Sequence, residues 1–562
     1  MNITLLAINS KYIHSSLALW YLTAACEPCG TLSPLEHSMN EPLFHILQSV
    51  YETNPDILVI SCYIWNIDYV LRLCPEIKAL LPDIRIILGG PEATFRAHEL
   101  MQTHLEIDLI LLGEGEESLP AVLNDLSHAE TIPGCVTRKD GKIIQCEGYQ
   151  YIQTLDSLRS PYSDQMLASL HGKLAYYESS RGCPFSCAYC LSCATQGVRT
   201  FSLSRVFADL RRLSKSGVQT IKFVDRTFNA DCKRAKAIIS FLLTLDAPVT
   251  YHFEVGADLF DEELLSMFHN APPGRFQIEA GIQSTYEPTL QAVCRTTNTQ
   301  KALNTIHEIT SWNTVHVHAD LICGLPYESF SIFARSFDDL YAAHPHALQL
   351  GFLKLLHGSS LRRDAAQYDY ISSPAAPYEV YASHVLSAKE LFRIHEIEDA
   401  VERYYNSGRF RTTLAYITTC VSSAFVLFSD LADNMKKNAN RYAALSPDRL
   451  FQILSDFCHA HSQIDTDRAD AALSFDYYCY SSTRFLPSFL KEPEDCFCRA
   501  CDYDLLQQLD LPLKELAKRF LIKDYPYDMS KSHLPAQKTT FLISRREKDP
   551  VTQRFVVKKL PD

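Results

Sequence analysis

Cys183-Pro-Phe-Ser-Cys187-Ala-Tyr-Cys190 brings three cysteines together in one short loop, with the spacing C-x3-C-x2-C. Thiolates are soft ligands that select iron–sulfur clusters or zinc. A four-iron cluster held by three cysteines keeps one iron open to a substrate or cofactor, so the spacing favours a reactive site. Two alternatives stay open on spacing alone. Cys193 would complete a closed electron-transfer cluster or a zinc knuckle, although zinc sites usually take their cysteines in separated pairs.

A strand is expected immediately before the cysteine loop, and further strands follow at helix-separated intervals. The apolar runs that predict them are 174–179, 220–225, 250–255, 275–282, 315–322 and 347–353. Between them, residues 206–216 and 231–245 show helical periodicity. These β–α units predict a partial (β/α)6 barrel over residues 173–355, with function at the C-terminal strand ends.

Polar residues follow most of these predicted strands, where they would face the cysteine loop. The set consists of Asp225, Arg226, Glu254, Gln283, Ser284, Asp320 and Lys354. Each one alone is equally well explained as a helix cap or a hydrogen-bonded core residue. A polar ring that converges on a cysteine loop favours an open, reactive cluster over the closed cluster and over zinc.

Residues 1–150 predict an α/β domain with an open parallel, Rossmann-like sheet. Apolar runs at 3–8, 57–62, 85–88 and 107–112 alternate with helical patterns such as 69–81. Ligands of such sheets bind beyond the C-terminal strand ends. Those ends carry Ser61, the aromatic pair Tyr63 and Trp65, and the turns Gly89-Gly90-Pro91-Glu92 and Gly113-Glu114-Gly115-Glu116. We therefore expect a large planar ligand, because glycines allow a bulky flat group to approach the backbone closely. A dinucleotide is not the first choice, because no Gly-x-Gly-x-x-Gly occurs.

The remaining chain divides into a hairpin, a linker and a C-terminal domain. A hairpin over 134–146 is expected to end the first domain, and residues 151–172 to form a linker. Residues 356–562 predict a mainly helical domain with helices at 378–405 and 447–461, followed by a hairpin at 539–559. Cys496, Cys498 and Cys501 are candidate ligands of a second cluster or zinc; ordinary reduced cysteines are the alternative.

The composition is that of a globular protein of about three domains, since the chain has 562 residues, 47% hydrophobic and 21% charged. A net charge of −13 argues against general binding to DNA or to anionic membranes. The N-terminus lacks the features of a signal peptide, and no apolar stretch is long enough to span a bilayer. These features, with 19 cysteines in a long chain, favour a reducing cytoplasm.

Four phrases resemble the signatures of radical S-adenosylmethionine (SAM) enzymes. They are Cys183-x3-Cys187-x2-Cys190 with Tyr189, the run 223–229 (Phe-Val-Asp-Arg-Thr-Phe-Asn), the run 278–284 (Ile-Glu-Ala-Gly-Ile-Gln-Ser) and the run 320–328 (Asp-Leu-Ile-Cys-Gly-Leu-Pro-Tyr-Glu). The Gly-Gly-Pro-Glu and Gly-Glu-Gly-Glu turns resemble the cobalamin-binding domain often fused ahead of such barrels. The likeness covers about residues 1–355, and the rest resembles an uncharacterised domain fused to a subgroup of these proteins.

The resemblance implies a set of cofactor contacts. Cys183, Cys187 and Cys190 would hold a 4Fe–4S cluster whose open iron chelates the amine and carboxylate of SAM, and Tyr189 would lie near the adenine. Either Asp225 or Arg226, and either Gln283 or Ser284, would contact the rest of SAM, with Glu254 as a further candidate. The cobalamin site would comprise Ser61, Gly89, Gly90, Gly113 and Gly115.

The chain departs from the family at two points. Many cobalamin-dependent members carry two acidic residues where this chain has Asp225-Arg226, which leaves the contact to the SAM amine open. No Asp-x-His-x-x-Gly occurs, so the cobalt is not expected to take the histidine of that motif. His14 is an alternative cobalt ligand, although a loop histidine more often has a structural role.

The implied function is a radical SAM enzyme that methylates an unactivated carbon, using a 5′-deoxyadenosyl radical and methylcobalamin. One alternative keeps the cofactors for a cyclisation or rearrangement without methyl transfer, and another is a non-catalytic cobalamin or iron–sulfur sensor. The expected partners are a small-molecule substrate rather than RNA and an electron donor such as flavodoxin or ferredoxin.

Overall fold

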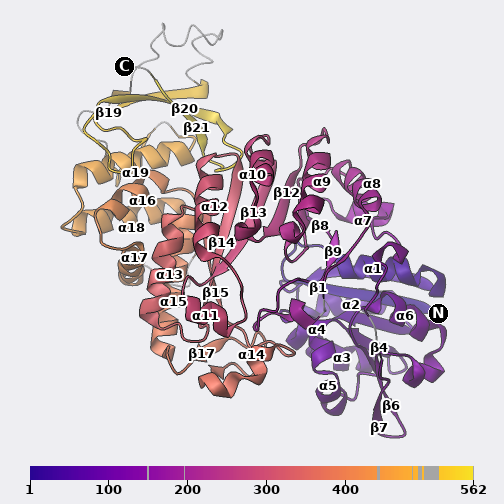
Figure 1. Cartoon of the computed structure of the whole chain (residues 1–562). Coiled ribbons are helices and arrows are strands. Elements are labelled where there is room, and N and C mark those ends of the chain that lie inside the picture. The colour runs from indigo at the N-terminus through magenta and orange to yellow at the C-terminus, as the bar shows by residue number, and fades with distance from the viewer. Residues whose placement is uncertain are drawn as a thin grey trace.

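The structure is a computed structural model that describes residues 1–148, 151–194, 197–438, 444–483, 485–491, 497–498 and 518–560. An N-terminal α/β domain lies on one side of a central barrel, and the C-terminal helices and sheet lie on the other side (Figure 1). The predicted fold class is confirmed. The predicted cysteine cluster at Cys496, Cys498 and Cys501 lies outside the described side chains.

The N-terminal domain is a sheet with the strand order β2-β1-β3-β4-β5-β6-β7. Its parallel strands are β1 (Asn2–Asn9), β2 (Thr31–Ser38), β3 (Ile57–Ser61), β4 (Arg85–Gly89) and β5 (Leu109–Leu111). The predicted hairpin, β6 (Cys135–Lys139) and β7 (Lys142–Gln145), adds the antiparallel edge. Strand β2 was not among the apolar runs, because its side chains are mostly half-buried at the opposite edge.

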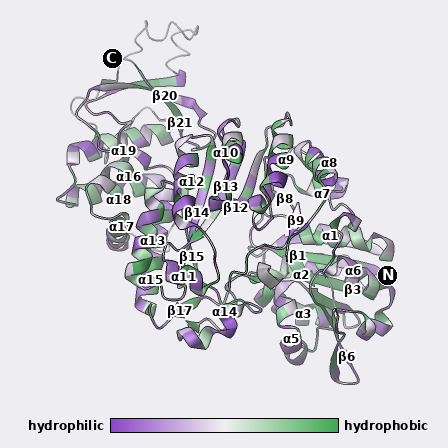
Figure 2. Cartoon of the chain, viewed as in Figure 1, coloured by the Kyte–Doolittle hydropathy of each residue, from purple (hydrophilic) through white to green (hydrophobic). Residues whose placement is uncertain are grey.

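Helices cover both faces of this sheet, as the sequence of β1 requires. Leu5 packs into one core and Leu6 into the other, because successive side chains of a strand point to opposite faces. The covering helices are α1 (Leu17–Cys26), α2 (Leu43–Glu52), α3 (Ile67–Leu80), α4 (Pro91–Phe95), α5 (Ala97–Thr103) and α6 (Gly115–Asn124). Figure 2 shows the hydrophobic colour concentrated in these central strands.

The predicted barrel strands form a parallel sheet in the order β8-β11-β12-β13-β14-β15. The strands are β8 (Ala175–Tyr177), β11 (Thr220–Phe223), β12 (Thr250–Val255), β13 (Phe276–Gln283), β14 (Val315–Cys323) and β15 (Ala347–Phe352). They alternate with α8 (Leu203–Ser214), α9 (Cys232–Leu243), α10 (Glu262–His269), α11 (Glu287–Ala292), α12 (Thr299–Ser311) and α13 (Phe330–Ala342). Between β8 and α8, the short ribbon of β9 (Ser180–Arg181) and β10 (Arg199–Thr200) flanks the cysteine loop. The linker before the barrel contains α7 (Asp164–Ser169).

The C-terminal region combines helices with a terminal sheet. After α14 (Ser360–Arg363) and the paired strands β16 (Ile371–Ser372) and β17 (Val380–Ala382) come α15 (Ala388–Ala400), α16 (Arg411–Thr419), α17 (Ala424–Asn438), α18 (Pro447–Ala460) and α19 (Thr466–Tyr480). The sheet holds β18 (Phe497–Cys498), β19 (Phe520–Tyr525), β20 (Thr539–Lys548) and β21 (Phe555–Lys559), and the last two are the predicted hairpin. No single helix in the described ranges is long and apolar enough to cross a membrane, and α16 with α17 passes that test only as a pair bent by 115°.

The helix predicted over 378–405 begins ten residues later than expected, at Ala388. Residues 380–382 pair as β17 instead, and Ser387 with Glu390 forms a capping box that starts the helix. A π-helical turn, Val401–Asn406, continues it to the predicted end.

The C-terminal region contacts both ends of the rest of the molecule. The β20–β21 turn reaches the N-terminal ends of the barrel strands, where the carbonyl of Val551 lies 2.8 Å from His316 Nδ1. At the opposite end, the Tyr378 hydroxyl donates to the buried Glu92 carboxylate at 2.7 Å, in the glycine turn that follows β4.

A buried ion pair holds the terminal sheet to the helices. Asp476, with a fully buried side chain, accepts from Thr412 N (3.1 Å), Thr413 N (2.8 Å) and Thr413 Oγ1 (2.8 Å), and it pairs with Arg554 Nη2 at 2.7 Å. Removing one partner of such a pair leaves an uncompensated buried charge.

Arg554→Ala is therefore expected to destabilise the C-terminal region by about 3 kcal/mol. Lys436→Ala is the control, because Lys436 pairs with Glu396 at 2.8 Å but is 65% exposed. Thermal unfolding followed by circular dichroism should show a clear loss for the first variant and almost none for the second. Equal melting temperatures for the two variants would contradict the buried pair.

Candidate functional site

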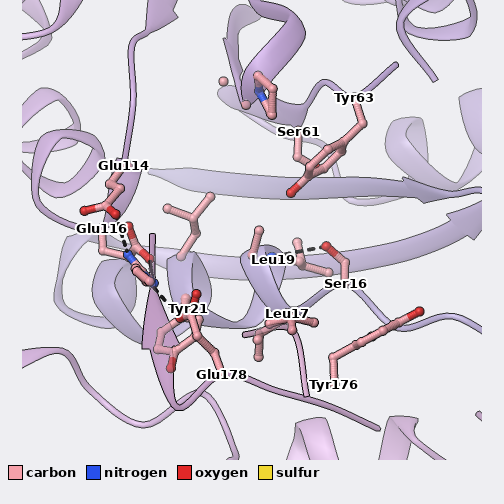
Figure 3. A pocket seen from close by; sticks show the side chains of 18 of the residues that line it. Ser16, Leu17, Leu19, Tyr21, Ser61, Tyr63, Glu114, Glu116, Tyr176 and Glu178 are labelled. Atoms are coloured by element: carbon pink, nitrogen blue, oxygen red, sulfur yellow. Dashed lines mark hydrogen bonds and ion pairs between the residues drawn. The ribbon is translucent and has the colours of Figure 1, made fainter. Parts of the chain in front are cut away.

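A cavity of about 750 Å³ lies at the carboxyl edge of the N-terminal sheet, against the barrel. The strand order reverses between β1 and β3, and open α/β sheets bind ligands at such a switch point. The ends of both strands and the loops after them line the cavity, through Asn9 and Ser10 at β1 and Ser61 and Tyr63 at β3. Figure 3 shows Ser61 and Tyr63 across the cavity from Tyr176 of the barrel.

The structure brings together the five residues that sequence assigned to the cobalamin site. Ser61, Gly89, Gly90, Gly113 and Gly115 all line this cavity. Gly90 has φ +93°, and a Cβ there would lie 2.6 Å from the carbonyl oxygen of Cys62. Glycine is thus required at Gly90 by the backbone, and the glycine turns line the cavity beside the side chains of Pro91 and Glu114.

Aromatic rings form a flat surface beside these turns. Tyr63 and Trp65 stack with ring centroids 4.4 Å apart and planes 4° from parallel. The Trp65 indole nitrogen donates to the carbonyl of Ile8 at 3.1 Å, which ties the loop after β3 to the end of β1. A glycine wall and a stacked aromatic pair suit a large planar macrocycle. His14 also lines the cavity, and its Nδ1 is already 2.6 Å from the Tyr176 hydroxyl.

The start of the cysteine loop is held by Asp225, which follows β11. Its carboxylate accepts hydrogen bonds from Ser179 N (2.9 Å) and Ser179 Oγ (2.6 Å) and from the Ser180 hydroxyl. Burial raises the pKa of Asp225, and these donors oppose the shift. Both carboxylate oxygens are therefore occupied in positioning the loop.

Each cysteine of the loop has a polar neighbour close to its sulfur. Arg295 Nη1 lies 3.8 Å from Cys187 Sγ, the Ser192 amide lies 3.4 Å from Cys190 Sγ, and Thr227 Oγ1 lies 3.7 Å from Cys183 Sγ. A cation and an amide dipole stabilise thiolates, which is the form that ligates iron. Among the described residues, no three His, Cys, Asp or Glu side chains surround the position of a single metal ion. A cubane cluster does not need such a position, because each cysteine binds a different iron. The Cys193 side chain lies outside the described residues.

A second cavity of about 200 Å³ lies beside the loop, at the C-terminal ends of the barrel strands. Its lining includes Phe185, Arg226, Glu254, Gln283, Arg295 and Asp320. Within the described chain, Gln283 Oε1, Arg295 Nε and Asp320 Oδ1 are buried there without a hydrogen-bond partner. Buried polar atoms are normally paired, so this lining fits a ligand with several donors and acceptors, as the amine, carboxylate and ribose of SAM provide.

The structure distinguishes between the alternatives that the sequence left open, Asp225 or Arg226 and Gln283 or Ser284. Arg226 and Gln283 line the small cavity, and Gln283 takes φ +70° next to a β-bulge in β13. Ser284 is buried, and its hydroxyl donates to Glu328 Oε1 at 2.5 Å. Asp225 and Ser284 thus support their neighbours, whereas Arg226 and Gln283 face the cavity.

Charge inside the small cavity is set by burial. Burial, reinforced by the carboxylates Glu279 and Glu254, raises the pKa of Asp320 to about 8. Glu279 has the opposite shift, to a pKa of about 2, because His252 and Lys222 lie against its carboxylate and outweigh burial. At neutral pH, Asp320 therefore holds a proton and Glu279 is ionised.

Arg295 lines the small cavity but was not predicted, whereas the predicted residues Lys354 and Tyr189 line neither cavity. Arg295 follows α11 with no recognisable pattern around it, yet its guanidinium contacts Cys187 and, at 3.4 Å, the Tyr189 hydroxyl. Lys354, from the predicted polar ring, makes a backbone bridge to Glu379 in the post-barrel segment. Tyr189 itself packs against the main core.

Family models match separate parts of the chain. The B12 binding domain matches residues 3–123, the radical SAM superfamily matches residues 177–340, and a domain of unknown function, DUF4080, matches residues 366–542. The chain thus joins a B12 binding domain to a radical SAM domain, as its motifs predicted. The two cofactor domains confirm the predicted cofactors, which are cobalamin, a 4Fe–4S cluster and SAM.

Curated relatives of this enzyme include methyltransferases. The chain is 25% identical over 334 residues to the 2-(S-pantetheinyl)-carbapenam-3-carboxylate methyltransferase of Streptantibioticus cattleyicolor, over 55% of this chain and 49% of that protein. It is 25% identical to the cobalamin-dependent radical SAM methyltransferase TokK of Streptomyces tokunonensis, over 54% of this chain and 47% of that protein. The chain thus spans about half the length of these relatives.

Solved structures share the fold. The cobalamin-dependent SAM radical enzyme OxsB, with aqua-cobalamin and SAM bound, superposes with a TM-score of 0.59 at 13% identity, over 84% of this chain and 78% of that one. The methyltransferase TsrM from Kitasatospora setae, with cobalamin and a [4Fe-4S] cluster bound, gives a TM-score of 0.56 at 15% identity, over 69% of this chain and 82% of that one.

Cys190→Ala is expected to abolish the cluster, whereas Cys193→Ala should retain it, because the open-cluster hypothesis gives Cys193 no ligand role. Iron and sulfide content and the visible absorption of anaerobically reconstituted protein measure this directly. A Cys193→Ala protein that loses its cluster would refute the open site.

Gly90→Ala is expected to weaken cobalamin binding, because the new Cβ overlaps the carbonyl of Cys62, which lies between the cavity residues Ser61 and Tyr63. Gly141→Ala is the matched control: its φ of +73° is also positive, but its Cβ would have no neighbour within 4 Å. Both changes place an alanine at positive φ, which costs about 1–3 kcal/mol of backbone strain, and a cobalamin titration reports the effect on the cavity apart from this strain. Equal cobalamin affinities in the two variants would contradict the assigned wall.

Proposed function

We propose that this enzyme methylates an unactivated carbon of a small-molecule substrate. When bound, the cluster and SAM supply a 5′-deoxyadenosyl radical that takes hydrogen from the substrate, and cobalamin delivers a methyl group taken from a second SAM. The protein contributes placement of the cofactors, exclusion of water and control of charge. The proposal extends to the whole chain, of which the curated methyltransferases match about half.

The observation that carries the proposal is that the large and small cavities adjoin. Arg226 and Glu254 line both of them, at the ends of neighbouring barrel strands. A substrate at this junction would meet the cobalamin cavity on one side and the SAM cavity on the other. Methyl transfer to a carbon radical requires such a three-way contact.

We assign roles to the residues in these cavities. Cys183, Cys187 and Cys190 hold the cluster, with Arg295 balancing the charge beside Cys187 and Tyr189 near the adenine. Gln283 and the protonated Asp320 offer hydrogen bonds to SAM, while Arg226 and Glu254 bound the substrate position. Ser61 and the glycines 89, 90, 113 and 115 form the wall for cobalamin.

A small molecule is the proposed substrate class, because the curated relatives include a carbapenam methyltransferase and the net charge of −13 gives no general attraction for RNA. We also propose a cytoplasmic location with flavodoxin or ferredoxin as the electron donor. Every cysteine whose side chain the structure describes is free of a disulfide, which suits a reducing compartment.

A cyclisation without methyl transfer is the second candidate. The chain is 26% identical over 241 residues to the anaerobic magnesium-protoporphyrin IX monomethyl ester cyclase of Synechocystis, over 40% of this chain and 47% of that protein. The same cavity arrangement would serve this reaction with no methyl group carried to the product.

Labelled SAM distinguishes the two candidates. Reduced, reconstituted enzyme is incubated anaerobically with methyl-labelled SAM and a small-molecule cell extract, with Cys190→Ala as the control that cannot cleave SAM. We expect 5′-deoxyadenosine together with a new labelled product that is absent from the control. A new product without label would favour cyclisation, and no SAM cleavage at all would refute both candidates.

A further inference from the structure

The two paired strands that flank the cysteine loop place two arginines opposite each other. We call this pair of strands, residues 180–181 and 199–200, the neck of the loop. Strand β9 leads into the loop and β10 leads out, and their antiparallel register pairs Arg181 directly with Arg199. Like charges directly opposite each other on paired strands are destabilising. A counter-charge is therefore needed between them.

Glu114 of the cobalamin-cavity turn supplies this charge. Arg199 binds it with both nitrogens, Nη2 to Oε1 at 2.6 Å and Nη1 to Oε2 at 2.9 Å. Arg181 Nη1 lies 3.5 Å from the same Oε1, and the Ile152 amide donates to Oε2 at 2.9 Å. Burial alone would raise the pKa of Glu114, but the two arginines and the amide hold it below its usual value. Glu114 is thus ionised at neutral pH.

Arg181 also bonds to carboxylates from both domains. Its Nη2 contacts Glu116 Oε1 of the same cobalamin-cavity turn at 2.5 Å, and its Nε contacts Glu178 Oε2 of the barrel at 2.9 Å. These side chains are 9–16% exposed, so solvent screens the contacts weakly. Burial raises the pKa of Glu178 to about 7. Figure 3 shows Glu114, Glu116 and Glu178 along one side of the cavity.

We propose that Arg181 is a positioning residue that fixes the cobalamin cavity to the neck of the cluster loop, and so sets the distance between cobalt and cluster. The inference rests on the proposed function. Arg181 stands two residues before Cys183, and its partners Glu114 and Glu116 alternate with the cavity glycines Gly113 and Gly115. A shift of this contact therefore moves the cobalamin wall relative to the cluster, and misplacement of about 1 Å can cost about a hundredfold in rate.

Lys173 offers a matched control. It forms another buried ion pair between the barrel side and the N-terminal domain, with Nζ 2.7 Å from Glu36 Oε2 of β2. The pair is 11% and 7% exposed, close to the values for Arg181 and Glu116. Unlike Arg181, Lys173 lies outside strands β9 and β10, ten residues before Cys183. Removing this pair weakens the contact between the two domains but leaves the Arg181 contacts in place.

The experiment measures cofactor geometry before activity. Arg181→Gln, Arg181→Lys, Glu116→Gln and Lys173→Gln are reconstituted, and iron and cobalamin content are measured for each. Electron paramagnetic resonance then records the magnetic coupling between the reduced cluster and cob(II)alamin, which depends steeply on their separation. Methyl transfer from SAM to reduced cobalamin and 5′-deoxyadenosine formation are measured in parallel, and neither needs the substrate.

We expect Arg181→Gln and Glu116→Gln to bind both cofactors but to show altered magnetic coupling. The ratio of methyl transfer to 5′-deoxyadenosine should fall at least about tenfold, because SAM cleavage needs the barrel alone. Arg181→Lys should recover part of the ratio, since a lysine keeps the charge but cannot bridge three carboxylates. Lys173→Gln should match the wild type.

Unchanged coupling and an unchanged ratio in loaded Arg181→Gln or Glu116→Gln would overturn the inference, as would an equal change in Lys173→Gln. If Arg181→Gln does not fold, the isosteric Glu116→Gln decides alone. A wild-type protein that performs neither reaction would instead refute the proposed function, so the two failures are distinguishable.

Discussion

The carboxylate of Glu114 is the contact that fixes the cysteine loop to the large cavity, because it lines that cavity and pairs with the arginines on both sides of the loop. Arg181 and Arg199 stand opposite each other at the neck of the loop, and without an anion between them they would repel. Glu114 belongs to the glycine turn of the first domain, so one interaction closes the neck and joins the two domains. The residue types of the turn differ in what they do: Gly113 and Gly115 line the large cavity, and Glu114 and Glu116 anchor the turn to the barrel.

The sequence predicted the framework because the framework is periodic and local. Alternating strands and helices placed the parallel sheets correctly, and the rule that ligands bind at C-terminal strand ends gathered Ser61 and the four turn glycines into one cavity. The ends of the barrel strands likewise brought Arg226, Glu254 and Gln283 to the small cavity beside the cysteine loop. The periodicity of hydrophobic residues and the positions of glycines are enough to predict such strands and the residues at their ends.

What the sequence missed depends on partners far away in the chain. Asp225 sits beside Arg226, but its carboxylate is occupied by Ser179 and Ser180, which no local pattern shows. Arg295 reaches Cys187 across more than a hundred residues of chain. The start of α15 is a different case, because the capping box of Ser387 and Glu390 was visible and outweighed the apolar run before it. Strand β2, half-buried at an edge, lacked a clear apolar run.

The C-terminal region braces the two cavities from outside the domains that line them. Tyr378 donates to Glu92, and Arg96 Nη1 donates to the same hydroxyl at 3.0 Å, so the Gly89-Gly90 turn is held from outside the first domain. At the other end of the barrel, Val551 bonds His316, and Pro550 packs so close to Gly274 that a Cβ there would lie 2.8 Å away. The region thus braces the cavity wall at one end and covers the strand starts at the other. Because Tyr378 lies within the DUF4080 match and holds the Gly89-Gly90 turn through Glu92, a change in that domain can alter the wall of the large cavity without lining it.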